Sequence, residues 1–212
     1  MGALMYEPEL KLRASRSKKA IDLDAIAKSA AHALEGTADD VFTELLDLSG
    51  SSGGARPKVL VGWRSKDDHL VHGAVEMPLD HVPYMVKFRA AHADPEDVGH
   101  IEFAYAEMAR AAGLEVSESR LFRGQDGNAY FGTRRFDRTR SGGRIHLHSL
   151  GGLLQASHRI AGSADYDDLI RATMRLTKDQ REVVRAYRQM IFNVLAHNRD
   201  DHVKNFAFAL AP

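Results

Sequence analysis

The stretch His197–Asn205 reads HNRDDHVKN, with an aspartate and an asparagine five residues apart at Asp200 and Asn205. A carboxylate can orient or deprotonate an attacking hydroxyl, and an amide oxygen can hold a magnesium ion against phosphate groups. Phosphoryl transfer needs both groups in one loop, so we predict Asp200 as the catalytic carboxylate and Asn205 as the metal ligand. Of the flanking residues, His202 would fix the loop or contact phosphate, and Lys204 would offset charge on the transferred group.

The surroundings of this stretch favour a catalytic loop over the alternative, a polar loop that caps a helix. Helical patterns are expected at 149–158, 165–175 and 178–196, and the last of these leads directly into the loop. The apolar run Phe206–Leu210 follows it. Helix, loop and strand in this order are typical of the helical lobe of a protein kinase.

The first part of the chain has a different periodicity. Short β-rich runs are expected at 58–62, 70–76, 84–89, 116–123 and 128–137, and helices at 22–35, 39–48 and 95–112. The dipeptide within Gln125–Gly127 predicts a hairpin between the last two strands. A sheet-rich part followed by a helical part predicts an α+β fold, with the boundary near Thr139–Arg144. We therefore expect an arm with helices over 1–48, a sheet-rich lobe over 49–138 and a partial, all-helical lobe over 139–212.

A glycine-rich segment, Ser51–Lys58, reads SSGGARPK and precedes the first expected strand. Two glycines let the backbone approach phosphate oxygens, and consecutive N–H groups in such a turn can bind an anion. Arg56 and Lys58 add positive charge. The spacing is not that of a Walker A loop. The alternative is a flexible turn before a strand.

Lys87 lies inside an apolar strand, where an ammonium group needs an anionic partner or an exposed strand edge. The helix that follows offers Glu102 and Glu107. Its apolar stripe is formed by Val98, Ile101, Tyr105, Met108 and Ala112. At about 100° per residue, Glu102 flanks this stripe and Glu107 lies on the far side, so Glu102 is the predicted partner of Lys87. An edge-strand lysine facing water is the alternative.

Glycine loop, strand lysine, helix glutamate and Asp/Asn loop occur here in the order of a protein kinase. Three segments make the likeness specific. Ser51–Lys58 is similar to the S-x-G-G-A-[RQ]-x-K loop of the HipA-like serine/threonine kinases, toxins of bacterial toxin–antitoxin systems. Arg135–Arg138 resembles the R-F-D-R segment at their interlobe hinge, and Asp200–Phe206 matches their D-x-H-x-K-N-F catalytic loop. The resemblance covers roughly Gly2 to the end and implies a kinase-like fold of two lobes.

The resemblance also implies a function and a set of site residues. ATP and magnesium would be the cofactors, and a protein serine or threonine would receive the phosphate, with glutamyl-tRNA synthetase the best-known target and other aminoacyl-tRNA synthetases as further targets. A DNA-binding antitoxin is the implied partner. Ser51 and Ser52 are the candidates for autophosphorylation. The implied nucleotide-binding residues are Ser52, Gly53, Gly54, Ala55, Arg56, Lys58, Lys87, Glu102, Arg134, Arg135 and Phe136, the last three through backbone that meets adenine.

The chain departs from this family pattern in two places. Only about fifty residues precede the glycine loop, where family members carry a small subdomain. No carboxylate follows Asp201, although the family has a magnesium-binding aspartate shortly after the catalytic loop. We therefore expect a truncated kinase with little activity by itself. The alternatives are a non-catalytic remnant that binds nucleotide or a partner, and a small-molecule phosphotransferase, against which the glycine loop argues.

Composition limits the partners and the compartment. Lys plus Arg equals Asp plus Glu at 29 each, so no global charge attracts nucleic acid or an anionic membrane, and we predict no direct binding to either. The chain has no cysteine, which excludes disulfides and thiolate metal sites, and no histidine motif predicts a structural metal. No apolar run approaches the roughly 20 residues of a membrane span. We expect a cytoplasmic protein.

Overall fold

The structure is a computed structural model that describes residues 21–34, 56–73, 77–90, 94–139 and 142–210. The chain divides into two compact units. The sheet unit comprises Met5–Glu107 and Val116–Gly143, and the helical unit comprises Met1–Leu4, Met108–Glu115 and Arg144–Pro212. The mixed α+β fold that the sequence predicted is confirmed.

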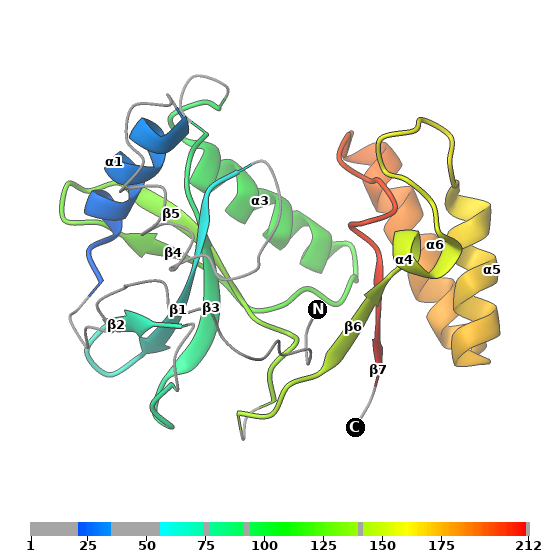
Figure 1. Ribbon diagram of the computed structural model, residues 1–212, viewed down its shortest axis with the longest axis horizontal. Coiled ribbons are helices and arrows are strands. Elements are labelled where there is room, and N and C mark those ends of the chain that lie inside the picture. Colours follow the sequence, from blue (N-terminus) through cyan, green and yellow to red (C-terminus); the bar gives the residue numbers. More distant parts are fainter. Residues whose placement is uncertain (1–20, 35–55, 74–76, 91–93, 140–141, 211–212) are drawn as a thin grey trace. The chain divides into compact units, whose positions relative to one another are not determined.

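The sheet unit contains a five-stranded antiparallel sheet (Figure 1). Its strands are β1 (Lys58–Arg64), β2 (His69–His72), β3 (Val82–Lys87), β4 (Ser119–Arg123) and β5 (Ala129–Arg134), in the order β2-β1-β3-β5-β4. The predicted hairpin is present, because β4 and β5 pair from Ser119 opposite Thr133 to Arg123 opposite Ala129. The strand expected at 70–76 ends earlier, at His72, and residues 74–76 lie outside the described ranges.

Helix α1 (Leu23–Leu34) packs on the core of this sheet through Leu23, which is 3% exposed. The core is made of Leu23, Val59, Val61, Tyr84, Val86, Phe88, Phe122 and Tyr130. One buried carboxylate, Asp24, accepts hydrogen bonds from the Tyr130 hydroxyl at 2.6 Å and from the Asp126 backbone N–H at 2.9 Å. The helix is thereby tied to the β4–β5 hairpin. The second helix expected at 39–48 falls outside the described residues.

Helix α3 (Val98–Ala111) turns a different face inward than the sequence predicted. The expected apolar stripe is partly in solvent, with Ile101 38%, Tyr105 43% and Met108 45% exposed. Small residues are buried instead, at Gly99 and Ala109. A Cβ atom at Gly99 would lie 2.4 Å from the Ala129 carbonyl oxygen, so the helix start approaches β5 closely enough to require glycine.

The helical unit contains α4 (Leu150–Leu154), α5 (Tyr166–Thr177) and α6 (Gln180–Leu195), and α5 and α6 lie side by side (Figure 1). Asp165 caps α5 with a capping box, and the Asp179 carboxylate caps α6. Lys178 adopts a left-handed conformation at the end of α5, which separates the two helices. The core is formed by Leu150, Leu169, Ala186, Val203 and Phe206.

One feature of the helical unit corrects the expectation of an all-helical lobe. A strand that the sequence analysis missed, β6 (His146–Ser149), pairs antiparallel with β7 (Ala207–Leu210). The buried residues of α6 are Ala186 and Asn193, whereas its larger apolar residues Tyr187, Val194 and Leu195 are 52%, 60% and 74% exposed. The pairing of β6 with β7 fixes the chain directly after the Asp200 loop.

Candidate active site

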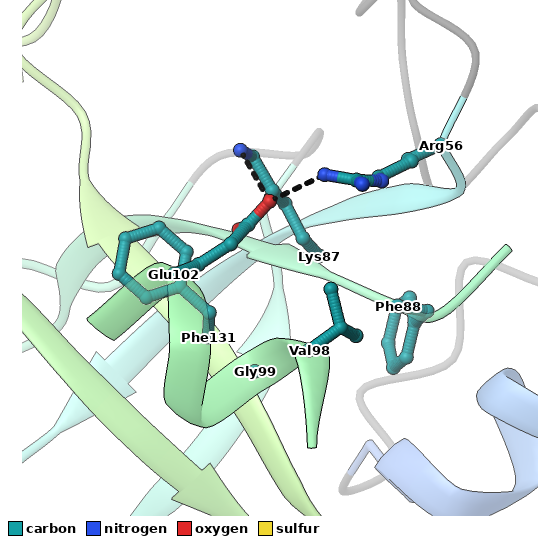
Figure 2. A pocket seen from close by; sticks show the side chains of 7 residues that line it. All are labelled: Arg56, Lys87, Phe88, Val98, Gly99, Glu102 and Phe131. Carbon is teal, nitrogen blue, oxygen red and sulfur yellow. Dashed lines mark hydrogen bonds and ion pairs between the residues drawn. The ribbon is translucent and has the colours of Figure 1, made fainter. Parts of the chain in front are cut away.

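The sheet unit holds the predicted lysine–glutamate pair (Figure 2). Lys87, at the end of β3, donates from Nζ to Oε1 of Glu102 on α3 at 3.1 Å. The pair is half-buried, with the side chains 32% and 16% exposed. Lys87 Nζ also lies 5.6 Å from the centre of the Phe131 ring. Glu102 is thus positioned to hold the ammonium group in one direction while it stays accessible to a ligand.

Arg56 joins the pair from the residue range just before β1. Its guanidinium group donates to Glu102 Oε1 at 3.0 Å and to Asp94 Oδ1 at 2.7 Å. Asp94 is buried, and its second oxygen accepts the Ala90 backbone N–H at 2.9 Å. Burial raises the pKa of Asp94, but the Ala90 N–H and Arg56 outweigh this and hold the pKa below its usual value. Asp94 was missed by the sequence analysis, although an aspartate before a proline at a helix start is a recognisable signal.

A third cation faces the same side of the sheet. Lys58 lies directly opposite Lys87 on the neighbouring antiparallel strand, and residues paired in this way project to one face. Three cations, Arg56, Lys58 and Lys87, therefore gather near two carboxylates, Glu102 and Asp94. Three cations against two carboxylates leave an excess of positive charge, which favours an anion such as a nucleotide phosphate at this face.

A small pocket lies among these residues, as Figure 2 shows. It is lined by Arg56, Lys87, Phe88, Val98, Gly99, Glu102 and Phe131. Its volume of about 10 Å³ leaves room for about one water molecule, so it cannot hold a whole nucleotide. The buried Oε2 atom of Glu102 has no hydrogen-bond partner among the described residues. The pocket thus holds one more acceptor for a donor group beside the lysine.

The segment that resembles an interlobe hinge has a rigid centre. Asp137 is buried and accepts two hydrogen bonds from the Arg135 guanidinium, at 2.9 and 2.7 Å, and one from Arg138 at 2.8 Å. Burial raises the pKa of Asp137, but the two arginines outweigh this and keep the pKa below its usual value. Phe136, between them, is 63% exposed. Arg134 Nη1 lies 3.6 Å from Glu118 Oε2.

In the helical unit, the loop after α6 gathers all four residues that the sequence singled out there. The Asp200 side chain is 83% exposed, and its Oδ1 lies 3.4 Å from His202 Nε2. His202 Nδ1 accepts the Lys204 backbone N–H at 3.3 Å. Asn205 Nδ2 donates to the Asp200 carbonyl oxygen, so the other atom of this amide, Oδ1, is the one that could meet a metal.

A histidine that the sequence analysis did not single out supports this loop. The His158 ring lies 5.3 Å from the His202 ring, centre to centre, with the planes tilted by 55°. Burial, followed by the charge of Lys204, lowers the pKa of His158. The uncharged form of the His158 imidazole is therefore favoured, and this ring lies beside His202 without adding charge near Asp200.

The predicted residues fall into two groups, one in each unit. Ser51, Ser52, Gly53, Gly54 and Ala55 of the glycine loop lie outside the described residues. In the ranges that the structure describes, no group of three or more His, Cys, Asp or Glu side chains is arranged to hold a metal ion. No helix in these ranges is long and apolar enough to cross a membrane.

Residues 50–212 match the family described as HipA-like C-terminal domain. The chain belongs to this family. Among solved structures, it is similar to a chain of the complex of HipA, HipB and operator DNA from the Shewanella oneidensis MR-1 toxin–antitoxin system. The TM-score is 0.55 at 20% sequence identity, and the match covers 76% of this chain and 40% of that chain. A search of curated proteins found no match.

The two comparisons support different statements about this HipA-like chain. The family match covers most of its length and shows membership. The structural match has low identity, so it shows the fold alone. The chain spans 40% of the length of the Shewanella chain that it matches. The roles of individual residues, the cofactors and the partners must therefore be argued from the site.

Proposed function

We propose that this chain carries active-site residues of an ATP-dependent serine/threonine protein kinase of the HipA type. The observation that carries the proposal is the ion pair of Lys87 and Glu102 at 3.1 Å. A strand lysine held by a helix glutamate is the arrangement with which protein kinases bind the α- and β-phosphates of ATP. The Asp200–Asn205 loop, which follows later in the chain in kinase order, supports the same assignment.

Each residue has a distinct part in the proposed reaction. Lys87, with Arg56 and Lys58, would bind the phosphate chain, and Glu102 would hold the Lys87 ammonium in position. Asp200 would orient the substrate hydroxyl and take up its proton as the hydroxyl oxygen bonds to the γ-phosphorus and the bond to the ADP leaving group breaks. Lys204 would offset charge on the transferred group. The exposure of the Asp200 carboxylate supports this role, because a substrate protein must reach it.

The residues of the helical unit fit a magnesium ion in part. Asn205 Oδ1 is an oxygen ligand of the type that magnesium prefers. Magnesium also commonly takes ligands from water and from the phosphates of the substrate, so a single oxygen from this loop is compatible with binding. When bound, the ion would neutralise negative charge on the phosphate chain.

For the biological setting we propose a toxin of a toxin–antitoxin system. The Shewanella structure that resembles this chain contains HipA together with HipB and operator DNA, which supports a DNA-binding antitoxin as the partner. The proposed substrate is an aminoacyl-tRNA synthetase such as glutamyl-tRNA synthetase. This substrate rests on the family resemblance of the motifs at Ser51–Lys58, Arg135–Arg138 and Asp200–Phe206.

The test is to incubate the chain with magnesium and ATP labelled on the γ-phosphate, alone and with glutamyl-tRNA synthetase. Calorimetry should show nucleotide binding that depends on magnesium. Because little activity is expected of the chain by itself, mass spectrometry should find only a low yield of phosphate on a serine or threonine. Absence of nucleotide binding at millimolar ATP would contradict the proposal. Binding without any transfer would instead favour a non-catalytic kinase remnant.

A further inference from the structure

Two adjacent carboxylates in the loop, Asp200 and Asp201, have opposite environments. The Asp200 side chain is 83% exposed, whereas Asp201 is partly buried and its Oδ2 accepts the Tyr166 hydroxyl at 2.6 Å. A hydrogen bond from a hydroxyl to a carboxylate is among the stronger ones in proteins. The Asp201 carboxylate is therefore held by a hydrogen bond inside the helical unit, and Asp200 is the one of the two carboxylates that faces solvent.

The Tyr166 hydroxyl is the first of several polar groups that connect Asp201 with Asp200. Asn193, which is 7% exposed on α6, donates from Nδ2 to the Tyr166 oxygen at 3.0 Å. Asn198 donates from Nδ2 to Asn193 Oδ1 at 3.2 Å. The backbone N–H of Asp200 donates to Asn198 Oδ1 at 3.1 Å. Since Asp200 and Asp201 are neighbours in the chain, these bonds close into a ring, which we call the Tyr166 ring.

Each hydrogen bond of the Tyr166 ring joins a donor to an acceptor. The one hydroxyl proton of Tyr166 is given to Asp201, so its oxygen is left to accept from Asn193. Turning either asparagine amide over would set two N–H groups against each other. This pairing of donors with acceptors favours one arrangement of the ring members over others.

The Tyr166 hydroxyl keeps its proton at neutral pH. Burial, followed by the hydrogen bond to Asp201, raises the pKa of Tyr166 to about 12. The tyrosine ring also packs against Phe206 at 5.8 Å between ring centres, edge to face. Tyr166 begins α5, and Phe206 follows the loop and belongs to the core of the helical unit. The aromatic side chain of Tyr166 therefore connects the loop with this core.

We propose that Tyr166, Asn193 and Asn198 are positioning residues that hold the Asp200 carboxylate in its place for phosphoryl transfer. The catalytic part of this statement rests on the proposed kinase function, whereas the conformational part does not. A base on a loop must keep its geometry within a fraction of an ångström, and the Asp200 side chain is 83% exposed, with His202 as its side-chain partner in the part of the chain that the structure describes. The Tyr166 ring fixes its backbone instead.

The experiment compares the full chain with Tyr166→Phe and Asn198→Ala. Tyr166→Phe removes one oxygen and retains the packing on Phe206, and Asn198 is exposed, so its loss should leave the fold intact. Tyr187→Phe is the matched control, because Tyr187 is 52% exposed on α6. Residue-resolved amide hydrogen exchange by NMR is measured at Asp200, and kcat and KM for ATP are measured in parallel.

Both test variants should speed exchange at the Asp200 amide about fivefold, the equivalent of one lost hydrogen bond, while the control leaves it unchanged. The kcat for phosphoryl transfer should fall about tenfold with an unchanged KM for ATP. Unchanged exchange at the Asp200 amide in Tyr166→Phe would contradict the statement that the Tyr166 ring fixes the Asp200 backbone. Faster exchange with an unchanged kcat would contradict its role in positioning Asp200 for phosphoryl transfer. If the wild-type chain transfers no phosphate, the kinase proposal fails while the exchange result still decides the ring.

Discussion

The two units hold their candidate functional groups by different means. In the sheet unit, Lys87 and Arg56 share one carboxylate oxygen of Glu102 through ion pairs of 3.1 and 3.0 Å. In the helical unit, Asp200 is exposed and its backbone is held by the Tyr166 ring, in which only Asp201 carries a charge. Cations that must attract phosphates can be oriented by fixed anions, whereas an exposed base on a loop can be held through its backbone by hydrogen-bonded side chains.

The largest expected effect is in the helical unit. Asp200→Ala removes the only group that we assign to the substrate proton, so phosphoryl transfer should fall by about 10²–10⁴-fold. Nucleotide binding measured by calorimetry should stay unchanged. Asp167→Ala is the control, because Asp167 is 62% exposed and pairs only with Arg171 on the surface of α5 among the interactions described here. If Asp200→Ala transferred phosphate at the wild-type rate, the exposed Asp200 would not be the catalytic base, and its difference from the hydrogen-bonded Asp201 would have no functional meaning.

The next effect is in the sheet unit. Lys87→Ala removes a charge-assisted contact to phosphate, which should weaken ATP binding about 10- to 100-fold. Lys66→Ala, in the exposed turn between β1 and β2, makes the same change in charge and serves as the control. Calorimetry at fixed ionic strength measures both variants. Equal affinities for the two variants would show that Lys87 does not contact the nucleotide.

A third prediction tests whether a hydrogen-bonded carboxylate also stabilises the sheet unit. Burial raises the pKa of Asp24, but hydrogen bonds from Tyr130, Asp126 and Asn128 outweigh this and lower the pKa below its model-peptide value. Asp24→Ala leaves these donors unpaired, and the free energy of unfolding should fall by about 2–4 kcal/mol near neutral pH. Chemical denaturation of wild type and variant measures this difference.

The pH dependence of that difference has a definite sign. Because the folded-state pKa of Asp24 is the lower one, the unfolded chain binds more protons between the two pKa values. The stabilisation is therefore complete above the unfolded-state pKa of about 3.9 and is lost as the pH falls through the folded-state value. Asp67→Ala, in an exposed pair with Arg64, is the control. A constant difference between wild type and Asp24→Ala down to pH 2 would contradict the assignment.

The smallest expected effect concerns Arg56, whose contribution to ATP binding should be smaller than that of Lys87. The Arg56 side chain is 45% exposed, and solvent screens the contribution of such a group. Arg56→Gln should weaken ATP binding only about threefold, and higher salt should reduce the difference from wild type. Titrations at low and high ionic strength measure it. A loss as large as that of Lys87→Ala would mean that Arg56 is the principal phosphate contact.

The choice of Glu102 shows how a sequence can indicate the right residue through an inexact argument. The helical phase places Glu102 beside an apolar stripe, which is the face expected to pack inward. The structure exposes that stripe and buries Gly99 and Ala109, and Glu102 lies three residues from Gly99 on the inward face. Periodicity of large apolar residues missed this face, because a close approach of helix and strand is made by small residues.

The members of the Tyr166 ring could not be selected from the sequence for a related reason. Asn193 follows Ala186 by two turns on the buried side of α6, and a polar residue there is a detectable signal. Its partner Asn198 lies only five residues further along, just after α6, but Tyr166 begins α5, and the packing of α5 against α6 brings it within hydrogen-bond distance. Likewise, the contact of His158 with His202 depends on the course of the loop before α5.

The sequence by itself determined the α+β class, the β4–β5 hairpin, the Lys87–Glu102 contact and the family, because these depend on local periodicity, turn residues and motif spacing. The tertiary structure decided which face of α3 is buried, that β6 pairs with β7, and which of two adjacent aspartates is exposed. Those features depend on contacts between residues far apart in the chain. The free energy of such contacts comes from burial and hydrogen-bond partners that no single segment contains.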